Sequence, residues 1–427
     1  IDEISMVHRA YFWQINLLLQ KLMGNTLPMG GKLFVVTGDF KQIPPVLEGS
    51  SNEEATMDAS ILADPVLWDL FEVSRLYRIN RCVDEKHNEQ LYRLGRGIDD
   101  SGNVCDVKYD VDFDAEGLYK RTDVTDEKGI HQLRNWCFED AWSTADGSAM
   151  FDHTIIAFRN DVVETHNRAI AHKFCTLHKR NPITLPGVTR LEDASNNITH
   201  AMASDETIQT WNPGNMPPHL LSLFIGCVIT VLRNLNMEEG LSNGTKLIVV
   251  KIDVGAKVVV CRDPLTGQLH DIPRIWHEGT QTGITIKRKQ FPLKVAYAQT
   301  SNRAQGATYK GRVVLDTTGH SFTHGQVYVG FSRVQQLSSL RIIGYRQTVV
   351  TTYQSLLKRS ADDHITFQAA KLEAEAHGAL DVFPDDGLPP TVATIPDVNE
   401  PMFDPQPDEQ LSGSGTSYVF LEETAVV

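Results

Sequence analysis

A pair of adjacent carboxylates, Asp2 and Glu3, follows Ile1 at the start of this 427-residue chain. Where an apolar strand meets a turn, such a pair can divide the work of phosphate chemistry. The first carboxylate can hold a Mg²⁺-bound water, and the second can polarise the water that attacks a phosphate. Adjacent acids also occur in ordinary solvated turns, so the pair predicts a site only together with other residues.

Segment 38–45, with the sequence Gly-Asp-Phe-Lys-Gln-Ile-Pro-Pro, supplies such residues. It follows an apolar run at 32–37, which predicts a strand beside the first one in a parallel sheet. Gln42 is then placed to contact a terminal phosphate and to report its presence. A loop stiffened by two prolines would explain neither Lys41 nor Gln42. We therefore interpret residues 1–6 and 38–45 as parts of one nucleotide-handling site.

Residues 296–308 predict a strand that ends in a polar turn. The turn offers a hydroxyl, an amide and a guanidinium, which suit the phosphates of a nucleic-acid strand. These candidate DNA contacts are Thr300, Asn302 and Arg303. Gln305 and Gly306 follow and are expected to face the nucleotide cleft. An ordinary polar turn before a glycine is the alternative, and it would be preferred if the segment stood alone.

Arg333 lies near the end of segment 324–334, after an apolar stretch that predicts a buried helix or strand. A buried arginine is costly unless it meets an anion, so contact with a terminal phosphate is one interpretation. A structural salt bridge is the other. The remaining motifs favour the phosphate.

Together these segments resemble motifs two, three, five and six of superfamily-one helicases of the Pif type (petite integration frequency). This family includes the helicase halves of Helitron transposons. Residues 76–81, 220–234 and 240–247 are similar to further segments of the family. Motif order and spacing agree from residue 1 to about residue 350. By this resemblance, Arg81 is a second arginine at the phosphates.

The resemblance implies an α/β fold with tandem RecA-like P-loop NTPase domains, the first of them incomplete. Short β-rich runs within residues 225–292 predict a small inserted β-barrel, and residues beyond 378 lack periodicity. The expected regions are 1–75 (end of the first motor domain), 76–190 and 291–360 (second motor domain), 191–290 (inserted region with the barrel) and 378–427 (disordered acidic tail).

The implied activity is that of an ATP-dependent DNA helicase that moves on single-stranded DNA and opens duplex junctions. In this assignment Asp2 holds Mg²⁺ and Glu3 activates water. Gln42, Arg81 and Arg333 contact the transferred phosphoryl group of ATP. DNA repair, recombination, telomere maintenance and transposition all fit such a motor, and the nucleus or mitochondrion is its expected location.

The sequence contains no Gly-x-x-x-x-Gly-Lys-Ser/Thr loop. Residues 240–246 superficially suggest one, but the spacing is wrong and an apolar strand follows. We therefore expect an N-terminally truncated fragment that begins at the Asp-Glu motif and by itself hydrolyses little ATP. The alternative is a non-catalytic nucleic-acid-binding remnant of a transposon helicase. A third reading is a relaxase-linked or recombination helicase of the same superfamily, which would have an added nuclease domain upstream.

Composition limits the classes of partner. The net charge of −14 opposes DNA binding by the chain as a whole, but residues 362–427 hold 14 of the 54 acidic residues and a single Lys. The rest of the chain is nearly neutral and can carry a basic groove. Six dispersed cysteines without a Cys-x-x-Cys pair argue against zinc and favour an intracellular protein. No apolar run is long enough to cross a membrane.

Overall fold

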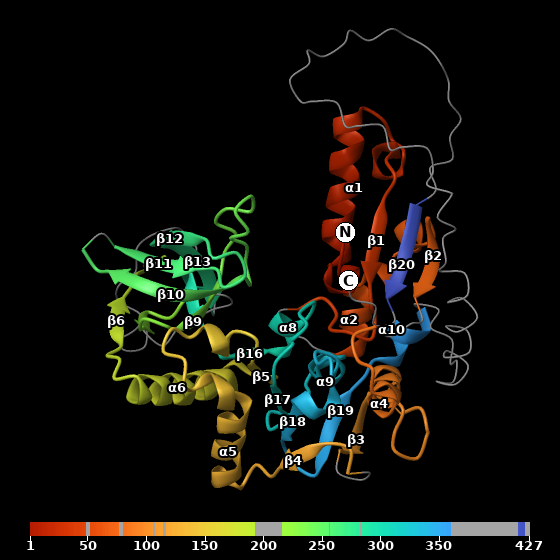
Figure 1. Ribbon diagram of the computed structural model, residues 1–427. Coiled ribbons are helices and arrows are strands. Elements are labelled where there is room, and N and C mark those ends of the chain that lie inside the picture. Colours follow the sequence, from red (N-terminus) through yellow and green to blue (C-terminus); the bar gives the residue numbers. More distant parts are fainter. Residues whose placement is uncertain are drawn as a thin grey trace, which may run out of the picture. The chain divides into compact units, whose positions relative to one another are not determined.

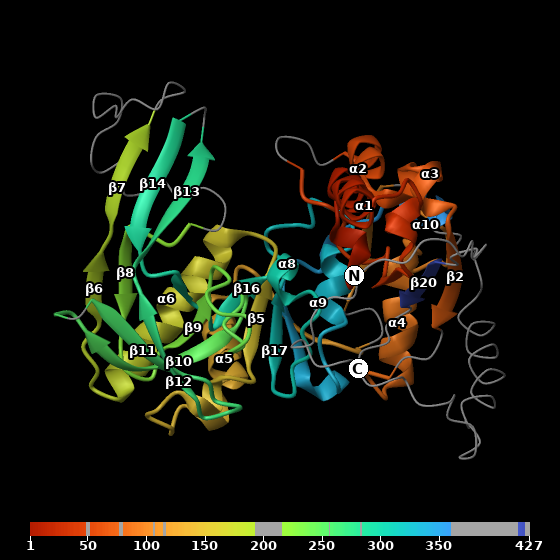
Figure 2. The same cartoon turned by 90° about the horizontal axis from the view of Figure 1, so that it is seen from above.

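The computed structural model describes residues 1–47, 52–76, 80–105, 107–113, 117–192, 216–255, 257–281, 284–359 and 417–422. The chain divides into two compact units. Unit 1 comprises Ile1–Asn80 and Tyr353–Val427, and unit 2 comprises Arg81–Thr352. Figures 1 and 2 show the elements of both units.

Unit 1 contains a parallel sheet of three strands in the order β1-β20-β2 (Figure 1). β1 (Val35–Gly38) and β2 (Phe71–Leu76) both pair with β20 (Ser417–Glu422) along its length. A strand from the far end of the chain thus lies between two strands from its beginning. The six residues of β20 lie within the region that the sequence predicts to be a disordered tail, and their backbone pairs on both sides. Residues 360–416 and 423–427 lie outside the described residues.

Among the described residues of unit 1, the longest helix is α1 (Arg9–Met23), which ends at a glycine. Gly24 adopts a left-handed conformation with φ of 64°, and its N–H donates to the carbonyls of the last turn. Phe12 is the buried anchor of α1 and contacts the rings of Phe34 and Phe71. The other helical elements are η1 (Ile4–Met6), η2 (Pro28–Gly31), α2 (Glu53–Ala59), η3 (Ile61–Ala63), α3 (Pro65–Trp68) and α10 (Gln354–Arg359).

Unit 2 contains a parallel sheet of five strands in the order β16-β5-β17-β18-β4. Every residue of β5 and β17 is buried, as expected for strands covered on both faces. The strands are β4 (Lys120–Thr122), β5 (Thr154–Ala157), β16 (Ala298–Thr300), β17 (Val313–Asp316) and β18 (Leu340–Ile343).

Alternate residues of β5 face different cores. Ile155 and Ala157 pack with residues of α5 and α6, whereas Ile156 packs with residues of α4 and α9. Helices therefore cover both faces of the sheet. They are α4 (Glu85–Arg96), α5 (Glu127–Cys137), α6 (Asn160–Leu177), α8 (Ser301–Ala304) and α9 (Gln326–Phe331). Smaller elements are β3 (Lys108–Asp112), η4 (Glu139–Ala141), η5 (Ser148–Met150), η6 (Leu337–Ser339) and β19 (Gln347–Thr351).

A β-rich part of unit 2 lies between α6 and β16 in the sequence. Its largest sheet is antiparallel, in the order β12-β11-β10-β9-β15, and smaller sheets are formed by β13-β14-β7 and β6-β8. The strands are β6 (Ile183–Pro186), β7 (Val188–Glu192), β8 (Leu220–Leu223), β9 (Val228–Val231), β10 (Lys246–Asp253), β11 (Val258–Arg262), β12 (Leu269–Pro273), β13 (Ile275–Gln281), β14 (Ile284–Gln290) and β15 (Leu293–Val295).

Residues 293–300 form two strands that belong to different sheets. β15 pairs with β9 in the antiparallel sheet, whereas β16 pairs with β5 in the parallel sheet. The fully buried Tyr297 lies between the two strands, and its carbonyl accepts from the N–H of Ile155 in β5 at 3.1 Å. The chain therefore leaves the β-rich part and enters the parallel sheet within three residues.

Among the described residues, no helix is both long and apolar enough to cross a membrane.

Candidate active site

Asp2 and Glu3 lie beside the end of β1 in unit 1. The amino group of Ile1 donates to the carbonyl of Val35 at 2.8 Å, and the N–H of Thr37 donates to the carbonyl of Ile1 at 2.9 Å. Asp2 Oδ1 accepts from Thr37 Oγ1 at 2.5 Å and from the Glu3 N–H at 2.8 Å. The structure thus brings the two acidic residues next to the strand that leads into segment 38–45.

Two backbone features permit this approach. A Cβ at Gly38 would lie 2.9 Å from Ile4 Cγ2 and 3.0 Å from the Ile4 nitrogen, so a larger residue would push η1 away from β1. Glu3 has φ of 53° and ψ of 44°, a left-handed conformation that is uncommon outside glycine. Such conformations persist where the surrounding structure enforces them, often at functional sites.

Segment 39–42 forms a buried cluster of polar side chains that are bonded to one another. Asp39 Oδ1 accepts from the Lys41 N–H at 2.9 Å and lies 3.5 Å from Lys41 Nζ, and Asp39 Oδ2 lies 3.5 Å from Gln42 Nε2. All three side chains are buried. Gln42 Oε1 is buried without a hydrogen-bond partner among the described residues. The Gln42 side chain therefore donates from its nitrogen to Asp39, and its oxygen is available to accept a hydrogen bond.

Asp2 has the chemistry expected of a Mg²⁺ ligand. Both of its hydrogen bonds reach Oδ1, and Oδ2 accepts none within the described part of the chain. That part also contains no group of three or more His, Cys, Asp or Glu residues that could hold a metal. Mg²⁺ that binds together with a nucleotide needs only one or two carboxylates, because phosphates and water supply its other ligands. The residues present fit that requirement.

In unit 2, the guanidinium groups of two arginines donate hydrogen bonds to the same serine, Ser332. Arg81 donates to the Ser332 carbonyl at 2.7 Å and to Thr308 Oγ1 at 3.0 Å. Arg333 donates to Ser332 Oγ from Nη2 at 2.6 Å and from Nε at 3.1 Å. The side chains of Arg81 and Arg333 are 8% and 1% exposed. Two cations held so close in a buried setting favour an anion with several oxygens, such as a phosphate.

The predicted turn at Gln305 and Gly306 is joined to this pair. Gly306 has φ of 77° and turns the chain after α8. The carbonyl of the next residue, Ala307, accepts from Arg333 Nη1 at 3.3 Å. The Gln305 N–H donates to the Ser301 carbonyl at 3.1 Å. Two hydrogen bonds and the backbone of residues 305–307 therefore connect the first residue of α8 to the paired arginines.

Thr300, Asn302 and Arg303 lie where β16 passes into α8, at the carboxyl end of a parallel strand. This is the edge at which ligands bind in open α/β sheets. Burial lowers the pKa of the Arg303 guanidinium. Ser301 Oγ, between Thr300 and Asn302, is buried without a hydrogen-bond partner in the described residues. The three predicted DNA contacts thus share one short stretch of backbone.

Asn167 of α6 fixes this edge, and sequence reasoning missed it. Its Nδ2 donates to the Ala298 carbonyl at 3.1 Å, and its Oδ1 accepts from the Ala298 N–H at 2.8 Å. A neighbouring side chain, His166, joins Asp316 Oδ2 through Nε2 at 2.7 Å. Arg134 Nε donates to His166 Nδ1 at 2.9 Å. An acid that ends an apolar strand, as Asp316 does, was the one sequence signal available for this cluster.

Lys246 is a second residue that was not singled out. Its ammonium lies 5.1 Å from the centre of the Tyr309 ring and has no hydrogen-bond partner in the described residues. Burial lowers its pKa to about 8. Lys246 belongs to β10 and Tyr309 follows the Gln305 turn, so this cation–π contact joins the β-rich part to the site.

Known protein families match two parts of this chain. The profile of the PIF1-like helicases matches residues 1–95, and that of the DNA helicase Pif1 2B domain matches residues 206–252. The chain is related to the Pif1-like helicases. The resemblance predicted from the motifs is thereby confirmed.

Curated relatives include the ATP-dependent DNA helicases PIF1 of Danio rerio and Homo sapiens. The first is 25% identical over 378 residues, which are 87% of this chain and 50% of the relative. The second is 25% identical over 353 residues, which are 81% of this chain and 46% of the relative. The chain thus spans about half the length of these Pif1 helicases.

Solved Pif1 structures share the fold. Bacteroides Pif1 bound to ssDNA is 20% identical with a TM-score of 0.52, and the match covers 80% of this chain and 69% of that one. Pif1 helicase from Candida albicans is 19% identical with a TM-score of 0.51, covering 85% and 76%. The predicted RecA-like α/β class is therefore confirmed.

Proposed function

We propose that this protein is an ATP-dependent DNA helicase, which couples ATP hydrolysis to movement on single-stranded DNA and to the opening of duplex junctions. The observation that carries the proposal is the bonding of Arg81 and Arg333 to Ser332. Through the Ala307 carbonyl, the same network reaches the turn that follows the predicted DNA contacts. The names of the Pif1 relatives support it.

In unit 1, Asp2 would bind Mg²⁺ through the carboxylate oxygen that Thr37 does not occupy. The metal, when bound, neutralises charge on the phosphates. Glu3, the next residue, would orient the attacking water and accept its proton. Gln42 would use its unpartnered oxygen to accept a hydrogen bond from that water beside the terminal phosphate.

In unit 2, Arg81 and Arg333 would bind the terminal phosphoryl group and stabilise its charge during transfer. Loss of that group removes the anion between two cations, so their hydrogen bonds must rearrange. Arg333 bonds Ala307, and the rearrangement therefore reaches the Gln305–Gly306 turn and then Thr300, Asn302 and Arg303. Through these bonds, release of the phosphate would change the affinity of the predicted contacts for a DNA strand.

On resemblance alone, we place this activity in DNA repair, recombination, telomere maintenance or transposition, within the nucleus or the mitochondrion.

The test is steady-state hydrolysis of Mg²⁺-ATP, with and without an oligothymidylate, by the parent protein that contains this chain. The 427-residue chain alone should hydrolyse little ATP, because it contains no Gly-x-x-x-x-Gly-Lys-Ser/Thr loop. In the parent protein we expect hydrolysis that depends on the oligonucleotide. The Glu3→Gln variant should lose at least about 100-fold in rate while it keeps its affinity for ATP and DNA, because it removes the base and leaves the binding groups in place. DNA binding without hydrolysis in the unmodified parent protein would instead favour the non-catalytic remnant.

A further inference from the structure

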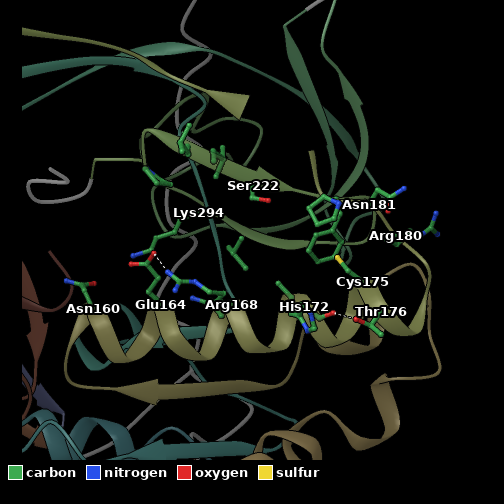
Figure 3. A pocket seen from close by; sticks show the side chains of 18 of the residues that line it. Asn160, Glu164, Arg168, His172, Cys175, Thr176, Arg180, Asn181, Ser222 and Lys294 are labelled. Carbon is green, nitrogen blue, oxygen red and sulfur yellow. Dashed lines mark hydrogen bonds and ion pairs between the residues drawn. The ribbon is translucent and has the colours of Figure 1, made fainter. Parts of the chain in front are cut away.

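A cavity of about 960 Å³ lies in unit 2, away from the arginine pair. One wall is a single face of α6, from Asn160 to Thr176, and the opposite wall is the segment from Met216 to Phe224. The two end residues are sixteen helical steps apart, and at a rise of about 1.5 Å per step this wall is about 24 Å long. Figure 3 shows the wall, with Asn160 near one end and Thr176 near the other. The cavity is therefore an elongated trough.

The charge of the trough differs from that of the chain. Its lining contains Arg168, Lys179, Arg180 and Lys294 but only one acid, Glu164, which pairs with Arg168 at 3.2 Å and leaves the lining with a positive balance. The chain as a whole has a net charge of −14. Arg180 Nε is buried without a hydrogen-bond partner among the described residues. A row of cations in an acidic protein favours an elongated anion over a neutral ligand.

The second wall is apolar. Met216, Leu221 and Phe224 are nearly fully buried there, and Leu220 and Val295 extend the surface. A cationic row beside an apolar wall is the combination that binds single-stranded nucleic acid, since phosphates meet the cations and bases cover the apolar surface. A free inorganic anion would use only the first wall.

The trough begins next to the predicted DNA contacts. Burial lowers the pKa of Lys294. Repulsion by the nearby cation Arg303 lowers this pKa further, and attraction by Glu164 partly offsets the fall. Asn167, which lines the trough, is the residue that clamps Ala298 of β16. In Figure 3, Lys294, Glu164 and Arg168 converge near one end, whereas Arg180 and Asn181 lie near the other.

We infer that this trough binds the stretch of single-stranded nucleic acid that extends beyond Thr300, Asn302 and Arg303, with its phosphates along Arg168 and Arg180. The inference rests on the proposed function, because it continues the strand held by those three residues. It adds a second group of contacts that only a strand long enough to reach past Lys294 can use.

The first test compares oligothymidylates of about 5 and about 12 nucleotides, lengths within the range of single-strand sites. Fluorescence anisotropy of the full chain is measured over a series of salt concentrations. In Arg168→Gln/Arg180→Gln, the slope of log affinity against log salt should fall by about 1.4 for the long strand, at about 0.7 per phosphate contact. The short strand should bind as in the unmodified protein. Lys251→Gln, an exposed cation outside the trough, is the matched control.

A second test does not depend on the charge variants. Ser222 is exposed on β8 inside the trough, so Ser222→Cys should form a disulfide with a thiol-tethered long oligonucleotide. The control, Thr266→Cys, lies on an exposed turn outside the trough and should not. Protection of Ser222→Cys from a small alkylating reagent should also require the oligonucleotide. Equal protection by polyglutamate would overturn the inference and assign the trough to an acidic polypeptide.

The outcomes separate this inference from the proposed function. If Arg303→Gln weakens binding of both lengths but Arg168→Gln/Arg180→Gln weakens neither, the trough is not a strand site and the proposed function stands. If the unmodified protein binds neither oligonucleotide, both fail.

Discussion

Both units contain a parallel sheet, but they obtain its central strand in different ways. In unit 2, β17 lies between β5 and β18, and residues 120–343 supply all five strands. In unit 1, β1 and β2 pair with no described strand other than β20, which comes from the end of the chain. The sheet of unit 1 therefore requires closure of a very long loop, which carries an entropic cost. Unit 1 should depend on a distant segment in a way that unit 2 does not.

The largest effect is expected from Val419→Pro in β20. Proline removes an N–H from a strand that is paired on both sides and should destabilise unit 1 by about 2 kcal/mol or more, through unpaired backbone groups. Hydrogen exchange should show loss of protection in β1 with retention in β17. Ser417→Pro, at the first residue of the strand and opposite Phe71 only, should have a smaller effect. Equal protection of β1 in both variants would remove the contrast between the units.

Gly38→Ala should separate the function of unit 1 from its stability. The added Cβ meets the backbone of Ile4, so η1 must move and the Asp2–Thr37 bond should break. We expect a cost of about 1 to 3 kcal/mol together with loss of ATP hydrolysis in the full-length protein. Gly255→Ala, where the nearest atom is 3.6 Å away, is the control and should leave both unchanged. Full hydrolysis by Gly38→Ala would show that the approach of η1 to β1 is not required.

Acid should weaken unit 2 through two buried histidines. Burial lowers the pKa values of His87 and His277 to about 4. The unfolded chain takes up these protons first, so the stability is fully present above pH 6.5 and is lost as the pH falls from 6.5 towards 4. For the fully buried His87 the loss at pH 5 is on the order of 1 to 2 kcal/mol.

This loss is measured by urea unfolding at pH 7 and pH 5, with hydrogen exchange of the β17 amides as the probe for unit 2. His277→Phe should reduce the difference between the two pH values. A difference that His277→Phe leaves intact would assign the pH dependence to other groups.

The smallest effect is expected at an exposed ion pair of unit 1. Arg9 and Asp58 are 2.9 Å apart, but their side chains are 34% and 69% exposed. Asp58→Ala should change the free energy of unfolding by less than about 1 kcal/mol, as for most surface pairs. A larger loss, measured by urea unfolding, would mean that unit 1 relies on surface charge as well as on β20.

Local features of the fold were predictable from sequence. The end of α1 at Gly24, the buried strands β5 and β17, and the start of α6 after a polar turn all follow from nearby residues. The role of β20 was not predictable in this way, because a strand needs partners and its partners lie near the other end of the chain. The division of residues 293–300 between two sheets was not predictable for a related reason, since one short run of sequence serves both sheets.

The candidate site divides similarly. Asp2, Gln42, Arg81 and Arg333 were predicted because their residue types and order match a family pattern. The bonding of both arginines to Ser332 is a property of packing, and no spacing rule indicates it. The trough beside α6 also has no sequence signature, because its walls come from segments that are separated in the chain.

The proposed function requires a link between the nucleotide and the DNA strand, which the arginine pair provides. The most direct test of this link is the affinity for a short oligothymidylate with and without a non-hydrolysable ATP analogue and Mg²⁺, in the full-length protein and in Arg333→Lys. Lysine keeps the charge but cannot reach Ser332 and Ala307 together with one planar group. We predict that the analogue changes DNA affinity in the unmodified protein and leaves it unchanged in Arg333→Lys, although Arg333→Lys still binds the analogue. The same nucleotide-dependent change in both proteins would show that the arginine pair does not provide this link.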